Sequence, residues 1–143
     1  MDYRKYSEEL LDLQIDCSGA LNQITANTLI RGEDSLLLWL CRQDAAVFPT
    51  DIMHHFRLSS GRVANILRST QKKGLITRCQ YGDDLRRNCI RITDAGRAYA
   101  SACREKILES QTAVLEGLSE KEAGNLAETF RRILQNVDEE TVA

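Results

Sequence analysis

Four arginines lie within residues 76–96, a short stretch of the sequence that reads ITRCQYGDDLRRNCIRITDAG. They are Arg78, Arg86, Arg87 and Arg91. A guanidinium group stays positively charged and presents a rigid fork of N–H donors that matches the oxygens of a phosphate. Arginines this close together around one turn therefore indicate a surface that binds a polyanion.

The distribution of charge over the whole chain supports this interpretation. The 143 residues carry a formal net charge of −2, but residues 57–104 contain eleven Lys and Arg against three Asp and Glu, a net charge of +8. Residues 1–56 and 105–143 each contain four basic and nine acidic residues. A basic middle between acidic flanks favours nucleic acid as the polyanion. The alternative is a solvated basic face without a partner, which scattered lysines would favour more than clustered arginines do.

A second group of polar residues precedes the arginine-rich stretch. Residues 59–73 read SSGRVANILRSTQKK and predict a helix whose buried face carries Val63, Ile66 and Leu67. Lysines in its last turn and the glycine that follows are typical of a helix end. The outward face of this helix then carries Ser60, Gly61, Arg62, Asn65 and Arg68.

The outward residues are of types that suit contacts with DNA. Ser59 and Ser60 open the helix, and together with Gly61 they offer hydroxyls and unhindered backbone N–H groups to phosphate. Arg62 and Asn65 are of the types that recognise the edges of guanine and adenine by paired hydrogen bonds. The helix therefore predicts a DNA-reading surface next to the arginine-rich turn.

The elements before this helix are expected to be helical as well. Residues 2–30 predict one long helix, because their apolar residues recur alternately three and four positions apart. Gly32 is expected to interrupt it, with Asp34 or Ser35 capping a short buried helix of sequence LLLWLCRQ. A brief strand is expected at residues 47–48, followed by a short helix that begins PTD, since proline and aspartate suit a first turn.

From residue 75 onward the apolar period changes to two and then back to that of a helix. LITRCQY and NCIRIT predict two strands joined by a turn, and a register that opposes Ile76 to Ile92 also opposes Cys79 to Cys89. Thr93 is expected to cap a long helix that ends near residue 118. A last helix should follow, because SEKE has the spacing of a capping box.

Three motifs within residues 50–96 resemble the MarR family of bacterial transcription regulators (multiple-antibiotic-resistance regulators). LSSGRVANILRSTQKKGLITR has the shape of the family's recognition helix, in which small residues lead and Lys-Gly-Leu-Ile closes. Asp84-Leu85-Arg86 matches the family's wing motif, Asp-x-Arg. Ile92-Thr93-Asp94-Ala95-Gly96 matches the Leu-Thr-x-x-Gly that closes the wing at the usual distance. The motifs cover about a third of the chain.

The resemblance implies a mainly α fold with a small β-wing. A winged helix-turn-helix lobe at about residues 34–96 would be flanked by dimerisation helices at about 2–30 and 94–138, within a single domain over residues 1–143. The relatives are dimers, and a two-fold dimer predicts a pseudo-palindromic operator in double-stranded DNA with half-sites about 10 bp apart. The implied function is that of a homodimeric regulator, more often a repressor.

The resemblance also assigns roles to three residues of the turn. Arg86 would enter the minor groove, where a narrow groove concentrates negative potential. Asp84 would orient Arg86 by a charge-assisted hydrogen bond, and Arg87 would contact phosphate. A winged-helix module that binds protein instead of DNA is the rival interpretation, but such modules tend to lack the basic residues present here.

The family's usual switch is a small apolar or phenolic effector bound between the dimer helices and the DNA-binding lobe. Trp39, Phe48, Met53 and His54 could line such a pocket, although each is equally suited to an ordinary core. The two adjacent histidines do not predict a metal site, because neighbouring residues of a helix diverge by about 100°. We therefore expect no metal and no cofactor.

Some relatives instead respond to oxidants through a thiol in the first helix, so the cysteines are weighed separately. Cys17 lies in the first predicted helix, but Asp16 beside it would raise the pKa of the thiol. Cys79 and Cys89 could be neighbours across the wing, with Arg78 and Arg91 nearby favouring the thiolates. Reduced, structural cysteines are the expected state in a cytosolic protein.

Other classes of protein are not indicated. The sequence has no Gly-x-Ser-x-Gly, no phosphate-binding glycine loop and no Cys-x-x-Cys spacing, so neither an enzyme nor a zinc ribbon is predicted. No apolar run approaches the roughly 18 residues that a membrane span needs, and the N-terminus lacks the apolar core of a secretory signal. We expect a cytoplasmic bacterial protein that does not contact membranes.

Overall fold

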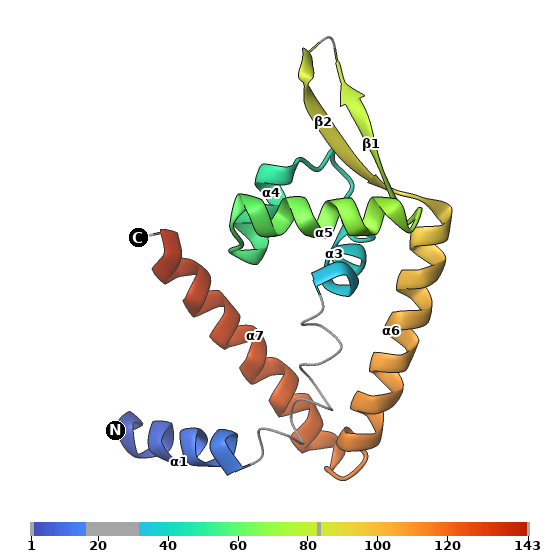
Figure 1. Ribbon diagram of the computed structural model, residues 1–143. Helices are drawn as coiled ribbons and strands as arrows, with labels where there is room; N and C mark the ends of the chain where they lie inside the picture. The colour runs from blue at the N-terminus through green and yellow to red at the C-terminus, as the bar shows by residue number, and fades with distance from the viewer. Residues whose placement is uncertain (1, 17–31, 83, 143) are drawn as a thin grey trace. The chain divides into compact units, whose positions relative to one another are not determined.

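The computed structural model describes residues 2–16, 32–82 and 84–142 and shows helices together with one two-stranded sheet (Figure 1). The predicted class, mainly α with a small β-wing, is confirmed. The chain divides into two compact units, residues 1–107 and residues 108–143. Among the described residues, no helix is both long and apolar enough to cross a bilayer. In chain order the elements are α1 (Tyr3–Asp16), α3 (Gly32–Leu40), α4 (Pro49–Phe56), α5 (Ser60–Lys72), β1 (Ile76–Tyr81), β2 (Asp84–Ile92), α6 (Asp94–Leu115) and α7 (Glu120–Val142).

The hydrophobic core of the first unit lies among α3, α4, α5 and the base of the hairpin. The predicted burial of the short apolar helix is confirmed, since three leucines of α3 are buried and the exposed residues of the segment, Cys41 and Arg42, come just after its end. The apolar face predicted for α5 is confirmed too. The core residues that are at most 1% exposed are Leu36, Leu37, Ile52, Val63, Leu67, Ile76 and Cys89, together with Thr70.

The starts of α4 and α5 follow the local sequence. The carboxylate of Asp51 accepts a hydrogen bond from the backbone N–H of Phe48 at 2.8 Å, so the first turn of α4 is closed by its own side chain. Ser59 caps α5 by accepting the N–H of Arg62 at 3.3 Å. The chain then leaves α5 through Gly74, whose φ of +74° is favourable for glycine and strained for other residues.

The cap predicted at Asp34 or Ser35 is wrong, because α3 spans Gly32–Leu40 and both residues lie in its first turn. The helix interruption predicted at Gly32 stays a prediction, since residues 17–31 lie outside the described part of the chain. A Cβ on Gly32 would lie 2.6 Å from Cδ1 of Ile66, which is too close for a carbon contact. Glycine therefore allows the start of α3 to approach α5, and this tertiary contact is not visible in a local pattern.

The two strands form an antiparallel hairpin that extends away from the helices of its unit (Figure 1). The register predicted from the sequence is confirmed, with Ile76 opposite Ile92 and Cys79 opposite Cys89. The strand expected at residues 47–48 is a single bridge, in which the N–H of Ile90 donates to the carbonyl of Val47 at 2.7 Å. This bridge fixes the base of the hairpin to the loop before α4.

The connection from the hairpin to α6 explains the Thr-x-x-Gly spacing. The hydroxyl of Thr93 donates to the carbonyl of Gly74 at 2.7 Å and accepts the N–H of Gly96 at 3.0 Å. A Cβ on Gly96 would lie 2.1 Å from the carbonyl oxygen of Leu75. Threonine thus caps the helix as predicted, while glycine lets the helix start lie against the strand start.

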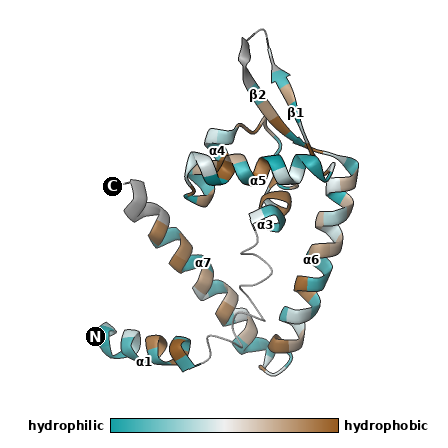
Figure 2. Ribbon diagram, in the orientation of Figure 1, coloured by the Kyte–Doolittle hydropathy of each residue, from teal (hydrophilic) through white to brown (hydrophobic). Residues whose placement is uncertain are grey.

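The helices α1, α6 and α7 each carry exposed large apolar side chains. Figure 2 shows hydrophobic residues alternating with hydrophilic ones along these helices. Within the helix predicted for residues 2–30, residues 3–16 are helical as α1, and residues 17–30 lie outside the described residues. The helix α6 ends at Leu115, three residues before its predicted end, because the chain turns there. The capping box that starts α7 is confirmed by reciprocal hydrogen bonds between Ser119 and Glu122, at 2.9 and 3.2 Å.

Candidate nucleic-acid interface

The exposed face of α5 carries the side chains that the sequence predicted for it. Arg62, Asn65 and Arg68 are exposed, whereas Val63 and Leu67 are buried on the other side of the helix. Arg68 donates through Nη1 to Oδ1 of Asn65 at 3.1 Å. Both side chains have N–H donors that this hydrogen bond does not use. These donors suit phosphate oxygens or acceptors on base edges.

The contact between Arg68 and Asn65 alters the role predicted for the asparagine. Recognition of adenine by Asn65 was expected to use both the oxygen and the nitrogen of its amide. In the structure the oxygen already accepts a hydrogen bond from Arg68. Paired recognition of adenine therefore requires Arg68 to release or share this oxygen.

The N-terminus of α5 offers backbone donors rather than side-chain acceptors. The Ser59 hydroxyl is engaged as a cap, so its oxygen serves the helix. Ser60 and Gly61 are exposed and lie in the first turn, where backbone N–H groups have no partner inside the helix. The space beside Gly61 is open, with no atom within 4 Å of a Cβ built there. An anion can approach these N–H groups without obstruction.

The hairpin supplies the second part of the basic surface. Its turn passes through Gly82, whose φ is +64°. Asp84, Arg86 and Arg87 belong to the start of β2, and the positions of their side chains lie outside the described part of the structure. The roles that the family resemblance gave to these three residues therefore stay predictions.

Side chains of the hairpin alternate between two faces, which separates its described arginines. Arg78 lies opposite Ile90, whereas Arg91 lies opposite Thr77. Successive residues of a strand point to opposite faces, so Arg91 shares a face with Cys79 and Cys89, and Arg78 lies on the other. The predicted proximity of Arg91 to the cysteines is confirmed by its hydrogen bond with Cys89, whereas the predicted influence of Arg78, from the opposite face, stays a prediction. Cys17 lies outside the described residues.

The residues predicted to line an effector pocket do not share a described cavity. Trp39, Phe48 and Met53 are half-buried and His54 is exposed. Trp39 instead stacks on His55, with ring centroids 4.6 Å apart, and packs edge-on against Phe56. Among the described residues, no three His, Cys, Asp or Glu side chains gather as a possible metal site.

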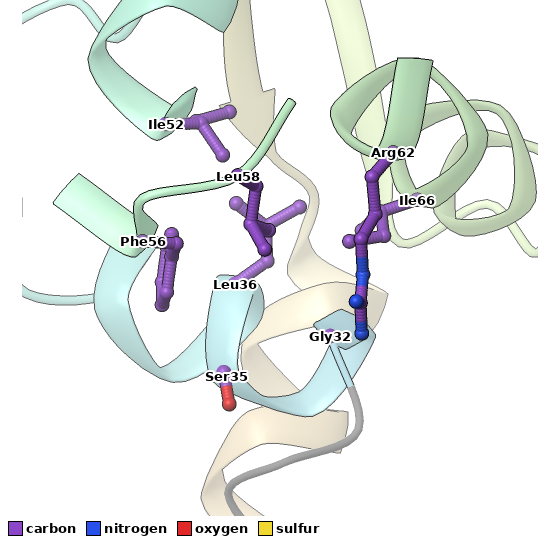
Figure 3. Close-up of a pocket in the computed structure, with 8 residues that line it drawn as sticks. All are labelled: Gly32, Ser35, Leu36, Ile52, Phe56, Leu58, Arg62 and Ile66. Atoms are coloured by element: carbon purple, nitrogen blue, oxygen red, sulfur yellow. The ribbon is translucent and has the colours of Figure 1, made fainter. Parts of the chain in front are cut away.

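A mostly apolar cavity of about 200 Å³ lies instead between α3, α4 and α5 (Figure 3). Arg62 forms part of its wall, and Figure 3 shows its side chain extending from α5 toward Gly32 at the start of α3. The same arginine therefore belongs both to the outward face of α5 and to a cavity. The lining residues are Gly32, Ser35, Leu36, Ile52, Phe56, Leu58, Arg62 and Ile66.

A polar cluster that no sequence pattern indicated ties the start of α3 to the end of α5. Lys73 forms an ion pair with Glu33 at 2.5 Å, and Ser69 donates a hydrogen bond to the same carboxylate. Burial alone would raise the pKa of Glu33, but the hydrogen bonds from Lys73 and Ser69 outweigh it, so the pKa is lowered. Because 36 and 40 residues separate the partners, helix periodicity could not have found this cluster.

Known structures with the same arrangement identify the fold. A MarR family protein from Bacillus stearothermophilus superposes with a TM-score of 0.77 at 20% identity, covering 96% of this chain and 99% of that one. The chain has the winged-helix fold of the MarR family. No protein-family model matches the sequence, and no curated protein does.

Two further structures share the MarR fold and concern a regulator called MepR. MepR, a transcription regulator of the Staphylococcus aureus multidrug efflux pump MepA, is 21% identical, with a TM-score of 0.59, and the match covers 96% of this chain and 98% of MepR. The S. aureus MepR–DNA complex is 23% identical, with a TM-score of 0.61 over 87% of this chain and 97% of that one.

Proposed function

We propose that this chain is a sequence-specific regulator of transcription that binds double-stranded DNA in the bacterial cytoplasm. The observation that carries the proposal is the composition of α5, which exposes Arg62, Asn65 and Arg68 on the side opposite its buried face. A helix of this kind fits the major groove, which is about 12 Å wide. The adjoining hairpin adds further arginines within reach of the neighbouring backbone or minor groove.

The net charge of the DNA-binding part supports an electrostatic contribution to binding. Residues 57–104, which include α5 and the hairpin, have a net charge of +8. Phosphate contacts release counterions from DNA, so the affinity should fall steeply as salt increases. A winged helix that bound protein through apolar contacts would show no such dependence.

We propose further that the regulator is a homodimer. The helices α1 and α7 each carry a row of apolar side chains that are largely exposed, among them Tyr3 (70% exposed) and Phe130 (59% exposed). Burying such surfaces against a second copy removes apolar area from water, the main driving force of association. Two recognition helices related by a two-fold axis would then read a pseudo-palindromic operator with half-sites about 10 bp apart.

Release from DNA by a small apolar or phenolic effector is part of the proposal, with repression as the mode of regulation. The cavity between α3, α4 and α5 is mostly apolar, and Arg62 lies at its wall. A ligand that holds the guanidinium of Arg62 in the cavity would withdraw it from the DNA surface. Calorimetric titration with simple phenols tests this step, and Leu58→Phe, which fills the cavity from its wall, should abolish any binding that occurs there.

The proposed function is tested by selecting bound duplexes from a random pool, followed by affinity measurements at two salt concentrations. We expect enrichment of a pseudo-palindrome whose affinity falls by about 10³-fold or more between 50 and 200 mM salt. The full-length protein should be confirmed as folded and dimeric by circular dichroism and light scattering before selection. A folded dimer that enriches no sequence and binds no duplex at 50 mM salt contradicts the proposal.

A further inference from the structure

The hairpin brings two cysteines face to face. Cys79 of β1 lies directly opposite Cys89 of β2, so both side chains point to the same face of the sheet. The N–H of Ile90 points away from β1, toward Val47, whereas the N–H of Thr93 donates to the carbonyl of Leu75. Leu75 and Thr93 are therefore a hydrogen-bonded pair, whereas Arg78 and Ile90 are not. Hydrogen-bonded pairs alternate along an antiparallel ladder, so Cys79–Cys89 is a hydrogen-bonded pair as well.

The type of pairing fixes the separation of the two backbones. Hydrogen-bonded pairs of antiparallel strands have Cα atoms about 5.5 Å apart. Disulfides span Cα separations of about 4.4–6.8 Å, most often about 5.5–6 Å. The Cβ atoms of facing residues are about 4.5–5.5 Å apart, compared with about 3.8 Å in a disulfide. A small movement of one strand toward the other would therefore bring the sulfurs within bonding distance.

The two thiols differ in exposure, and a cation lies beside them. Cys79 is partly exposed, whereas Cys89 is only 1% exposed. Arg91 lies on the same face, and its side-chain hydrogen bond with Cys89, followed by its charge interactions with Cys89 and Cys79, raises the pKa of Arg91. A permanent positive charge therefore lies beside both sulfurs.

The other described cysteines lack this arrangement. Cys41 is exposed at the end of α3, and Cys103 lies on α6. Burial, and then the charge of Asp34, raises the pKa of the Cys103 thiol, which disfavours its reactive form. Only Cys79 and Cys89, among the cysteines that the structure describes, are paired across a sheet.

We propose that Cys79 and Cys89 form a redox-sensitive pair, which a hydroperoxide converts into a disulfide across the wing and which thereby controls DNA binding. The effect on DNA rests on the function proposed above. The formation of the disulfide does not depend on that function. Such a bond joins the two strands of the element that presents Asp84, Arg86 and Arg87.

The chemistry balances with the hydroperoxide as the only oxidant. The Cys79 thiolate attacks the terminal peroxide oxygen, the O–O bond breaks, and an alcohol (water, if the peroxide is H₂O₂) leaves as Cys79 becomes a sulfenic acid. The Cys89 thiolate then attacks the sulfenic sulfur, the S–S bond forms and the hydroxyl leaves as water. Two electrons pass from the two thiols to the peroxide, and the two thiol protons end in the alcohol and the water. A dithiol reductant reverses the change.

The disulfide is expected to weaken DNA binding because it deforms the wing. Closing the Cβ separation pulls the strands together at a hydrogen-bonded pair, and a bulge follows at Gln80/Tyr81, directly beyond it. The change in twist is thus transmitted toward the turn of the hairpin. A disulfide under such strain is also more easily reduced, as a reversible switch requires.

The first test maps the bond itself. The full-length protein is treated with one equivalent of hydrogen peroxide, its free thiols are alkylated, and it is digested with trypsin without reduction. Cleavage after Arg78, Arg86, Arg87 and Arg91 leaves Cys79 in the peptide CQYGDDLR and Cys89 in NCIR. We expect these two peptides to appear joined and two thiols to be lost. Loss of thiols with no joined peptide, or with any other pair joined, overturns the proposal.

The second test measures the affinity for the selected duplex before and after oxidation. The affinity of the wild type should fall by about tenfold or more, as for the loss of a wing contact, and dithiothreitol should restore it. Cys79→Ser, at the partly exposed position, should bind DNA as the reduced wild type does, and peroxide should no longer lower its affinity. The control variants Cys41→Ser and Cys103→Ser should still lose affinity after treatment with peroxide. Unchanged affinity in a protein whose joined peptides are confirmed overturns the regulatory role. Absence of DNA binding even in the reduced protein would contradict the proposed function and leave the mapped disulfide standing.

Discussion

Arg68 donates a hydrogen bond from Nη1 to Oδ1 of Asn65, at 3.1 Å, on the exposed face of α5. The two residues are three positions apart, the spacing at which helix side chains are neighbours. Because each side chain restricts the other, their contributions to DNA affinity should be coupled. Asn65→Ala and Arg68→Ala should each weaken binding by about 1–3 kcal/mol, and the double variant should lose less than the sum, by about 0.5 kcal/mol or more.

A double-mutant cycle on the selected operator measures this coupling directly. Circular dichroism and thermal unfolding of all four proteins serve as the control, because both residues are exposed and their replacement should leave the fold intact. Strictly additive losses would mean that the contact between Arg68 and Asn65 does not persist in the complex with DNA.

A second prediction concerns the wing. Arg86→Ala should reduce DNA affinity by about 1–3 kcal/mol and leave the dimer folded, because a minor-groove arginine contributes to binding and not to the core. The slope of log affinity against log salt should also decrease in magnitude by about 1. Arg42→Ala is a matched control, since Arg42 is exposed outside the basic segment and should bind as the wild type does. Equal affinities for Arg86→Ala and wild type would contradict the role assigned to the wing.

The sequence predicted the parts of the fold that short-range patterns determine. Ser59, Thr93 and the Ser119–Glu122 pair each act within three residues along the chain, and all three caps were found where they were expected. The register of the hairpin followed from the alternation of apolar residues, because a shift of one residue would turn Ile76 and Ile92 away from the core. The outward face of α5 followed in the same way from the helical period.

Contacts between distant segments could not be predicted in this way. The role of Gly32 depends on Ile66, and that of Glu33 on Ser69 and Lys73, which lie 36 and 40 residues away. The pocket predicted for Trp39, Phe48, Met53 and His54 stays a prediction. Residue types indicate which side chains suit a cavity, but packing decides which of them surround it, and here Trp39 stacks on His55 instead.

A third prediction tests the packing role of the glycine that follows the wing. Gly96→Ala should lower the free energy of unfolding by about 1–3 kcal/mol, because its Cβ would lie 2.1 Å from the Leu75 carbonyl oxygen and one of the two backbones must move. The matched control is Gly124→Ala on α7, where no atom lies within 4 Å of a built Cβ. That variant should be more stable by up to about 1 kcal/mol, as for a glycine replaced in a helix. Urea unfolding at a fixed protein concentration measures both, and a neutral Gly96→Ala would contradict the close contact.

The last prediction concerns the cluster of Glu33, Ser69 and Lys73. The hydrogen bonds to Glu33 lower its pKa in the folded protein below the ordinary value of 4.5, so the contribution of the carboxylate to stability is fully present above that value. The contribution is lost as the pH falls through the lowered pKa, where the folded protein also takes up the proton. Glu33→Gln should therefore be less stable than wild type at pH 7, by at most about 1 kcal/mol for so exposed a pair.

The difference in unfolding free energy between wild type and Glu33→Gln should shrink steadily below pH 4.5. Urea unfolding at several pH values measures it, with Glu105→Gln, at an exposed position of α6, as the control for loss of one negative charge. A difference between Glu33→Gln and wild type that stays constant down to the acid limit of folding would mean that shape, not charge, makes Glu33 matter. In that case the link between α3 and α5 would rest on Ser69 and the close packing of Gly32 against Ile66.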